Sequence, residues 1–340
     1  MDFMKPIHTE TTKCQDCYKC LRQCSVKAIK ILGGHAKIIH DFCILCGHCV
    51  QVCPVSAKKI RNDLDRARLL LQKKKRVFAS LAPSFVNEFN GIKAENITAA
   101  IQKLGFEGIS ETALGAQEVS ANIREILQKG EKEIYISSAC PTVVSYIKKY
   151  RPEFAAKITD MLSPLLAHAK ILRREYGEEI GIVFIGPCIA KKNEADMFPE
   201  LVDISITFQD LRKWWKQEGI LLEKIDEQRN FVPNKAEEGA LYPIDGGMIA
   251  GIKANCTVND AQFMTFSGME NLEKILEDLS HIELKGPLFL ELLACEGGCV
   301  NGPAMSTKSG TAIKRYEVID YSQYPEEKIA RKPEIDIQVD

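Results

Sequence analysis

From residue 77 onward, short hydrophobic runs alternate with stretches in which hydrophobic residues recur at helical spacing. The runs predict strands at 77–82, 133–137, 180–185, 204–208, 262–266 and 287–293. The stretches between them predict helices at 97–104, 116–128, 142–150, 164–176, 209–217 and 268–278. This alternation is typical of an α/β fold with largely parallel sheets that are covered on both faces.

The first 60 residues lack this alternation and carry most of the cysteines. The next stretch, 61–76, is charged and contains leucines at 64 and 69–71, which predicts a linking helix with a basic end. We therefore expect an N-terminal unit at 1–60, the linking helix at 61–76 and a larger domain at 77–340. The chain becomes polar from about Met305, and 334–340 is predicted to be an edge strand or a loose tail.

Cysteine is the unusual feature of the composition. Eight of the 13 cysteines lie between Cys14 and Cys53, and the other five are Cys140, Cys188, Cys256, Cys295 and Cys299. Residues 1–10 lack the apolar core of a signal peptide. The longest apolar stretch, 181–190, is too short for a membrane span, which needs roughly 20 residues. We therefore expect a cytoplasmic protein that uses its cysteines for metal and not for disulfides.

Two cysteine runs share one spacing. Residues 14–24 read C-Q-D-C-Y-K-C-L-R-Q-C and residues 43–54 read C-I-L-C-G-H-C-V-Q-V-C-P, with Ser25 where the second run has its proline. The spacing C-x2-C-x2-C-x3-C is that of bacterial two-cluster ferredoxins, in which the fourth cysteine of each run binds the other cluster. Zinc is the alternative, because C-x2-C also builds zinc ribbons. One predicted 4Fe–4S cluster takes Cys14, Cys17, Cys20 and Cys53, and the other takes Cys43, Cys46, Cys49 and Cys24.

The net charge of −1 conceals an asymmetry. Residues 1–76 contain 16 Lys/Arg and six Asp/Glu, a net charge of +10, so the remainder carries −11. A basic segment beside iron–sulfur clusters fits an acidic electron carrier such as a ferredoxin or flavodoxin. Nucleic acid is a poorer fit, because no pattern of stacking aromatic residues accompanies the basic run 73–76.

Four of the later cysteines follow predicted strands. Cys140 precedes Pro141, a favourable first residue for a helix, and Cys188 stands in G-P-C-I-A-K-K-N-E. Cys295 and Cys299 follow the last strand in L-A-C-E-G-G-C-V-N-G-P. The carboxyl ends of strands are where α/β proteins place their sites, so these four thiols are able to converge. A lone cysteine is usually a small buried hydrophobic residue, and this is our interpretation of Cys256.

These segments resemble the three cluster-binding motifs of FeFe-hydrogenases. The matching segments are S-S-A-C-P, G-P-C-I-A-K-K-N-E-A and E-L-L-A-C-E-G-G-C-V-N-G, and the similarity runs from about residue 13 to residue 305. The resemblance implies two twisted sheets flanked by helices, with an H-cluster between them. Cys140, Cys188, Cys295 and Cys299 would hold a 4Fe–4S cubane. Cys299 would bridge it to a di-iron subsite that carries CO, CN and azadithiolate ligands.

The resemblance also implies roles for other residues. Lys191 would donate a hydrogen bond to one cyanide, and the turn Ala82-Pro83-Ser84 would meet the other. The pair Gly246-Gly247 would permit a close backbone approach near the cluster. The implied reaction is H2 ⇌ 2H⁺ + 2e⁻, with electrons passing through the cubane and then through the ferredoxin-type clusters.

The departures from the family pattern are informative. Ala139 stands where the most active relatives carry a cysteine that passes protons, and neither Asn122 nor Ile123 is the acidic residue expected to continue that route. Further replacements are Gly186, Leu165 and Leu293, together with V-N-G-P-A after the last cysteine. The pattern resembles the divergent, sensory branch of the family, often called group D. We expect slow turnover, with protons passing through Glu291, Glu194 or water, and a separate signalling protein as reader.

A second interpretation is an iron–sulfur assembly or scaffold protein. The hydrogenase-like assembly factor of eukaryotes has the four late cysteines, the alanine and the lysine, but it lacks the di-iron subsite. Its N-terminal cysteines bind one cluster, whereas the eight cysteines here predict two, which favours the hydrogenase. A simple electron-transfer protein would leave the four late cysteines unexplained.

Overall fold

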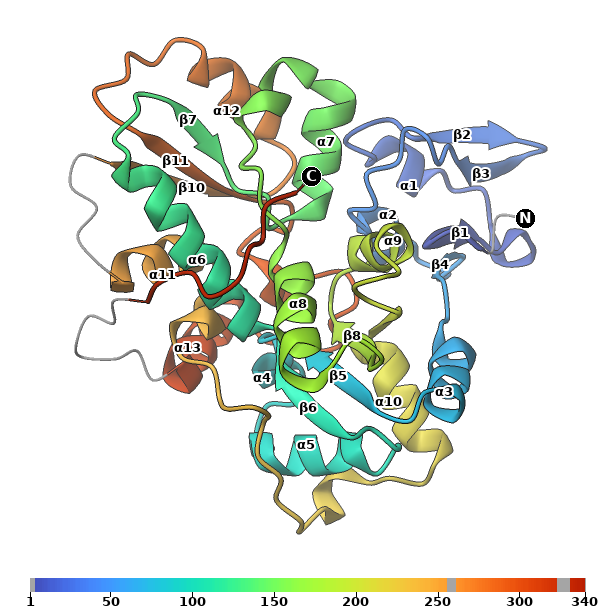
Figure 1. The fold of residues 1–340 in the computed structure, drawn as a ribbon. Helices are drawn as coiled ribbons and strands as arrows, with labels where there is room; N and C mark the ends of the chain where they lie inside the picture. Colours follow the sequence, from blue (N-terminus) through green and yellow to red (C-terminus); the bar gives the residue numbers. More distant parts are fainter. Residues whose placement is uncertain (1–3, 256–260, 323–330, 340) are drawn as a thin grey trace.

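The structure, a computed structural model, describes residues 4–255, 261–322 and 331–339. Cys256 lies outside these residues. The N-terminal unit, blue in Figure 1, lies beside a larger α/β body that contains two separate sheets. None of the described helices combines the length and the apolar composition that a membrane crossing requires.

The N-terminal unit is built from two antiparallel strand pairs. β1 (Ile7–Thr9) pairs with β4 (Lys58–Ile60), and β2 (Ile29–Leu32) pairs with β3 (His35–Ile38). β1 and β4 bring the two ends of the unit together, so the cysteine runs are held as loops between paired strands.

The two cysteine runs fold as a repeated loop. Left-handed backbone recurs at equivalent places in the two runs, in the pairs Asp16 and Leu45, Tyr18 and Gly47, and Lys27 and Ser56. Each run continues into a one-turn helix, α1 (Lys19–Arg22) or α2 (His48–Gln51). The sulfurs of Cys24 and Cys53 each accept a hydrogen bond from the backbone four residues later. The duplicated sequence therefore produces a duplicated loop, as a two-cluster ferredoxin requires.

Helix α3 (Leu64–Lys73) follows the N-terminal unit. Its first turn is held by a buried charge network: the Lys192 ammonium lies 2.9 Å from Asp63 Oδ2, and both side chains are fully buried. Arg61 also pairs with Asp63, at 3.0 Å, and with Asp196, at 2.7 Å. These contacts fasten the linking region to the α/β body.

The larger sheet is four-stranded and entirely parallel. Its order is β6 (Gly108–Glu111), β5 (Val77–Leu81), β8 (Gly181–Gly186) and β9 (Ile204–Thr207). Every residue of the four strands is buried, so both faces are covered. The helices around it are α4 (Phe85–Glu88), α5 (Ala94–Gln102), α6 (Ala113–Gln128), α8 (Pro164–Tyr176), α9 (Ala190–Met197) and α10 (Phe208–Gln217).

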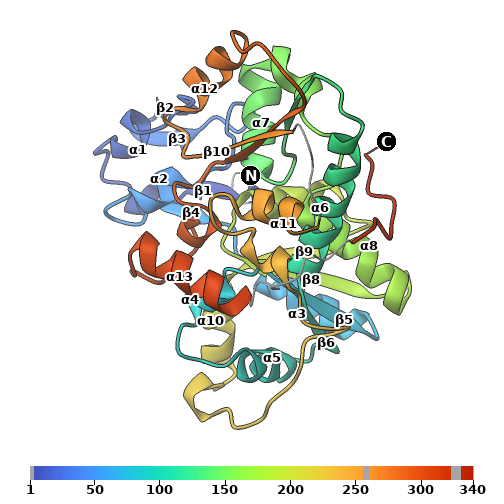
Figure 2. The ribbon, with the colours of Figure 1, turned by 90° about the vertical axis from the view of Figure 1, so that its left-hand side faces the viewer.

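The smaller sheet is three-stranded and also parallel. β11 (Leu288–Leu293) lies between β10 (Gln262–Ser267) and β7 (Ile134–Ile136). β11 is completely buried, whereas the edge strand β10 is partly exposed, so the expectation of two covered faces is wrong for that edge. The nearby helices are α7 (Pro141–Tyr150), α11 (Gly247–Asn255), α12 (Leu272–Leu279) and α13 (Thr311–Ser322). The chain alternates between the two sheets, so they form one body, which Figure 2 shows turned by 90° from the view of Figure 1.

Short 3-10 turns complete the described chain, at Thr11–Lys13, Pro152–Lys157, Leu222–Lys224, Glu238–Leu241 and Cys299–Asn301. The α/β class and the parallel sheets confirm the sequence prediction. Some boundaries were wrong. Phe208 begins α10 and does not end a strand, because Thr207 and Asp210 form a capping box there. The predicted helix at 268–278 begins only at Leu272, since Gly268 has a positive φ.

His168 on α8 connects that helix to the larger sheet inside the core. Its Nδ1 lies 2.8 Å from Ser80 Oγ on β5, and its Nε2 lies 2.8 Å from Ser110 Oγ on β6. Burial lowers the pKa of His168 to about 3, so the folded protein keeps the ring neutral at ordinary pH.

Acid is therefore expected to destabilise the fold through His168. Between its unfolded pKa, about 6.5, and its lower folded pKa, the unfolded chain binds a proton that the folded chain does not, so stability falls as the pH falls. Urea unfolding of the wild type and His168→Gln, from about pH 7 to about pH 4, measures this effect. The wild type should lose more stability than the variant toward acid, and parallel pH profiles would contradict the assignment.

Candidate metal centre

A largely apolar cavity opens where the parallel strands end. Its walls include Ser84 after β5, Thr112 after β6, Cys140 after β7, Cys188 after β8 and Cys295 after β11. Strands from both sheets therefore deliver residues to one space, as expected for the carboxyl ends of parallel strands.

The sequence-predicted site residues meet in this cavity. Its lining contains Cys140, Cys188, Cys295, Cys299, Lys191, Glu291, Ala139, Ala82, Pro83 and Ser84. Leu165 and Leu293, two of the noted replacements, also line it. The backbone at Gly247 approaches the Leu241 carbonyl, where a Cβ would lie 1.8 Å from the oxygen. The close backbone approach at this glycine pair is therefore to the backbone of Leu241 in the same chain.

The four late thiols are half-buried at the cavity wall and lie close to one another. Burial, reinforced by the charge of Cys140, raises the pKa of Cys188 to about 11. Burial and the neighbouring cysteines also raise the pKa values of Cys295 and Cys299. Four thiolates in an apolar cavity repel one another, so the ionised set needs positive charge. Iron bound to the sulfurs supplies that charge, and the donor set therefore fits an iron–sulfur cluster.

The spacing of the sulfurs distinguishes a cluster from a single ion. With Zn–S bonds of about 2.3 Å, a tetrahedral zinc site brings its sulfurs to within about 3.8 Å of one another. Among the described residues, the three candidate ligand atoms found within 4.8 Å of one another belong to Cys14, Asp16 and His35, and not to any set of cysteines. In the described part of the chain, no three cysteine sulfurs therefore lie as close together as one zinc ion would require.

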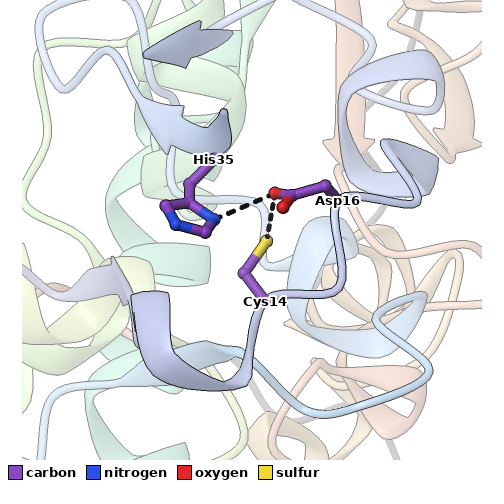
Figure 3. Close-up of side chains that lie close together, drawn as sticks. All are labelled: Cys14, Asp16 and His35. Atoms are coloured by element: carbon purple, nitrogen blue, oxygen red, sulfur yellow. Dashed lines mark hydrogen bonds and ion pairs between the residues drawn. The ribbon is translucent and has the colours of Figure 1, made fainter. Parts of the chain in front are cut away.

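The set of Cys14, Asp16 and His35 lies at the rim of the first cysteine loop (Figure 3). His35 Nδ1 lies 3.0 Å from Asp16 Oδ1, and the Cys14 thiol donates to the same oxygen at 3.4 Å. The spacing of the run predicts Cys14 as a ligand of the first cluster, and Asp16 and His35 would then be neighbours of that cluster.

Lys191 points its ammonium into a short polar network. Lys191 lies in the first turn of α9. Its Nζ donates a hydrogen bond to Ser163 Oγ at 2.8 Å and forms an ion pair with Glu194 Oε2 at 2.6 Å. Lys191 and Glu194 are both 8% exposed. Glu194 and Ser163 line a second cavity, on the other side of the lysine. The three side chains therefore lie between two cavities. Lys191 and Glu194 are three residues apart on one helix, and residues at this spacing are neighbours on the helix surface.

Glu291 is the buried acid of the main cavity. It lies on β11, is 1% exposed, and accepts hydrogen bonds from the backbone N–H groups of Met248 (3.4 Å) and Ile249 (3.2 Å) at the start of α11. Burial raises the pKa of Glu291 to about 7, although these N–H groups oppose the shift. The carboxyl group is therefore poised to exchange a proton near neutral pH.

Ala139 offers no group that exchanges protons. Its backbone N–H donates to Ser137 Oγ at 3.1 Å, and that hydroxyl lies 3.0 Å from Met248 Sδ. Asn122 is on α6, where its amide donates to Glu118 at 3.0 Å. Glu118 is held by the backbone N–H groups of Glu334 and Ile335, so it serves the C-terminal segment.

Thr112, Tyr242 and Met248 are among the lining residues that sequence reasoning missed. The Tyr242 hydroxyl lies 2.8 Å from Ser120 Oγ on α6. The sequence around these residues carries no motif, and they reach the cavity only because β6, α6 and α11 pack together. Long-range packing of this kind leaves no local signal.

The N-terminal cysteines are arranged in two places. Cys14, Cys17, Cys20 and Cys53 line one small cavity, as the predicted exchange of fourth cysteines requires. In the second set, Cys46 lies close to Cys43 and Cys24, and Cys46 also lines the main cavity. A Cβ at Gly47 would lie 2.5 Å from Pro303, so the second run packs tightly against the α/β body.

Two family models match this chain. Residues 75–303 match the model described as "Iron only hydrogenase large subunit, C-terminal domain". Residues 6–66 match the model described as "4Fe-4S dicluster domain". The first match covers the cavity and its cysteines, and the second covers both cysteine runs.

Three similar curated proteins are hydrogenases. Iron hydrogenase 1 of Clostridium pasteurianum is 24% identical over 371 residues, covering 88% of this chain and 64% of its own. The NADP-reducing hydrogenase subunit HndD of Solidesulfovibrio fructosivorans is 24% identical over 378 residues, with the same coverage. The periplasmic Fe hydrogenase large subunit of Nitratidesulfovibrio vulgaris is 26% identical over 286 residues, covering 68% of this chain and 67% of its own. The chain thus spans just under two thirds of the first two relatives.

Solved structures share the fold. A structure described as showing stepwise FeFe-hydrogenase H-cluster assembly, HydA(deltaEFG), aligns with a TM-score of 0.61 at 17% identity, covering 80% of this chain and 90% of that one. A variant of FeFe-hydrogenase HydA1 from Chlamydomonas reinhardtii aligns with a TM-score of 0.60, with the same identity and coverage. At this identity the likeness concerns the fold.

Proposed function

The chain belongs to the iron-only hydrogenase family, and on that basis we propose that it interconverts H2 with protons and electrons at an H-cluster. One observation supports this proposal above all. A single cavity is lined by Lys191 and by the four cysteines Cys140, Cys188, Cys295 and Cys299. An H-cluster bound there would supply the chemistry for heterolytic cleavage of H2.

The proposed residue roles follow from the walls of the cavity. The four late cysteines hold the cubane, with Cys299 as the thiolate shared with the di-iron subsite. Lys191, kept in place by Ser163 and Glu194, directs its ammonium toward an anionic ligand. The turn Ala82-Pro83-Ser84 offers backbone and hydroxyl groups to a second ligand. Apolar residues such as Leu165 and Leu293 exclude water from the remaining wall.

The proposed electron route leads from the cavity into the N-terminal unit. Cys46 shares the cavity wall with the late cysteines, so the second ferredoxin-type cluster is the first acceptor. Cys17, a proposed ligand of the first cluster, is exposed, and this supports an exit at the protein surface. The net charge of +10 on residues 1–76 suits an acidic carrier such as a ferredoxin or flavodoxin. The proposed organisation of the chain is an N-terminal ferredoxin-like unit at 1–60, a linking helix at 61–76 and a hydrogenase-like domain at 77–340.

We propose Glu291 as the proton carrier that replaces the missing thiol. It is the acid of the cavity wall, and its pKa of about 7 matches neutral conditions. Glu194 is the alternative, because it reaches the second cavity through its contact with Lys191. With Ala139 in the usual position, turnover is expected to be slow.

The test is H2 evolution by the anaerobically maturated protein with reduced methyl viologen, compared with Glu291→Gln and Glu194→Gln. We expect measurable wild-type turnover, and a fall of about 10²–10⁴-fold in Glu291→Gln, because a positioned proton carrier contributes on that scale. A comparable fall in Glu194→Gln alone would assign the route to the second cavity. No turnover in a wild type that carries all three cubanes would favour the scaffold interpretation.

The proposed biological use is hydrogen sensing, read by a separate protein. It rests on the loss of the proton-passing thiol at Ala139, because a sensor does not need rapid turnover. The cytoplasmic location stays a prediction from the cysteine content, and one of the relatives is named as periplasmic.

A further inference from the structure

Helix α13 (Thr311–Ser322) lies beyond residue 303, where the hydrogenase family match ends. It nevertheless packs on the loop that carries Cys295 and Cys299. The hydroxyl of Thr311 and the amide of Asn301 lie 2.9 Å apart, and a Cβ at Gly297 would lie 2.6 Å from the Thr311 methyl group. A helix outside the matched region therefore supports a loop inside it.

Lys314 is the buried residue at the centre of this contact. It is 4% exposed, and its ammonium donates to the Val300 carbonyl at 3.2 Å and to Asn301 Oδ1 at 2.9 Å. Val300 and Asn301 are the two residues that directly follow Cys299. They belong to the stretch V-N-G-P-A in which this chain departs from the family pattern, so the departure and the lysine meet in space.

Asn301 closes the loop on itself. While its Oδ1 accepts from Lys314, its Nδ2 donates to the Glu296 carbonyl at 3.0 Å. Glu296 directly follows Cys295, and Asn301 lies two residues after Cys299. The hydrogen bond from the Asn301 amide therefore joins the two ends of the segment between the two cysteines. Lys314 in turn fixes that amide.

The charge of Lys314 needs an explanation of its own. Both hydrogen bonds of the ammonium go to neutral oxygens. In the described part of the chain, no carboxylate lies within ion-pair distance of it. Glu88 and Glu317 act on it only from farther away, and they are themselves held by Arg212 and by Asn87 and Asn90. Burying an unpaired charge is costly. An anionic cluster bound by Cys295 and Cys299 would offset that cost by long-range attraction.

We propose that Lys314 is a positioning residue for Cys299. Its two hydrogen bonds fix the loop after the thiolate, and its positive charge stabilises the reduced, more negative state of the bound cubane. This inference rests on the proposed cubane at the four late cysteines, and it assigns a purpose to both the unusual V-N-G-P-A stretch and the helix that follows it.

The test uses the full chain reconstituted with iron and sulfide, without the di-iron group, so that it requires no hydrogenase activity. The signal of the third cubane is identified by its loss in Cys188→Ala, and its midpoint potential is measured by electron paramagnetic resonance during a redox titration. The variants are Lys314→Met, which keeps the length of the side chain, and Lys314→Arg, which keeps the charge. Lys308→Met is the matched control, because it removes an exposed lysine from the same segment.

In Lys314→Met, the ratio of reduced to oxidised third cubane at fixed potential should fall about tenfold, a midpoint shift of about 59 mV to lower potential for one electron. Iron should also leave this cubane faster when a chelator is added. Lys314→Arg should recover the potential, Lys308→Met should match the wild type, and the two N-terminal clusters should not shift. If Lys314→Met does not fold, Asn301→Ala should still accelerate iron loss.

Two results would overturn the inference, and they are distinguishable. A wild-type protein without a third cubane would overturn the proposed function together with the role of Lys314. A third cubane whose potential and iron loss are unchanged in Lys314→Met and in Asn301→Ala would overturn the role of Lys314 alone.

Discussion

Cys299→Ala is expected to abolish H2 turnover and to remove the di-iron group. Cys299 lies in the cavity with three other cysteines, and in the proposed site its sulfur is shared by the cubane and the di-iron subsite. The one further described thiol in the cavity wall is that of Cys46, which the sequence predicts as a ligand of the second cluster. The N-terminal unit does not depend on Cys299, so the two ferredoxin-type clusters, with about eight irons, should remain.

Iron analysis and viologen-linked H2 assays of maturated protein measure the effect. Cys256→Ala is the control, because the sequence assigns no metal to that thiol, and it should retain iron and activity. A Cys299→Ala variant that keeps turnover would show that the di-iron group is held elsewhere. Loss of the N-terminal clusters in the same variant would show that the two parts are not independent.

Asp63→Asn is expected to destabilise the folded chain by about 3–5 kcal/mol, because it removes the charged partner of a buried lysine. The Lys192 ammonium would keep the Ser205 carbonyl at 2.9 Å and Asp210 at 3.3 Å, but it would lose its contact at 2.9 Å with a fully buried carboxylate. The loss should appear in urea unfolding at neutral pH. Asp65→Asn is the matched control, because Asp65 lies two residues further on, in the first turn of α3. Its side chain is 94% exposed, so it should cost less than about 1 kcal/mol.

The effect of Asp63 should depend on pH. Burial alone would raise the pKa of Asp63, but Lys192 and Arg61 outweigh it and hold the pKa below the usual value. A carboxyl group with a lowered folded pKa stabilises the protein above its unfolded pKa, about 3.9, and this contribution is lost as the pH falls through the folded pKa. The difference in the free energy of unfolding between the wild type and Asp63→Asn should therefore become smaller in acid. A difference that stays constant to low pH would contradict the ion pair.

Strands whose burial depends on hydrophobic side chains were predictable, and strands whose burial depends on distant partners were not. β5, β8 and β11 were expected near their observed positions because they are continuous hydrophobic runs. β6 was missed, because Ser110 and Glu111 look like loop residues. Ser110 is buried against His168, and Glu111 accepts from the Ala236 N–H and the Tyr321 hydroxyl. No local pattern contains those partners.

The C-terminal region shows the same limit. The polar stretch after Met305 gave no sign of α13, because its buried side includes Lys314 and Ser322. The expected edge strand or tail at 334–340 is an extended segment in its described part. Ile337 is fully buried there, and Gln338 forms a bridge with Met161. Both segments are fixed by contacts with chain more than ten residues away.

The site was more predictable than its surroundings. Cysteine spacing is local, so the two runs could be assigned directly, and the strand-end rule brought the late thiols together. The pairing of Lys191 with Glu194 was also local, at three residues along one helix. Thr112, Tyr242 and the contact between Lys314 and the Cys299 loop depend on how distant helices pack, and only the structure reveals them.

In the proposed function, the cavity of Cys140, Cys188, Cys295 and Cys299 holds a di-iron group beside its cubane. Infrared spectroscopy of the anaerobically maturated protein tests this most directly, because carbon monoxide and cyanide on iron absorb where proteins do not. We predict carbon monoxide and cyanide bands in the wild type and their absence in Cys299→Ala. A wild type that contains all three cubanes yet shows neither band would contradict the claim and favour an iron–sulfur scaffold.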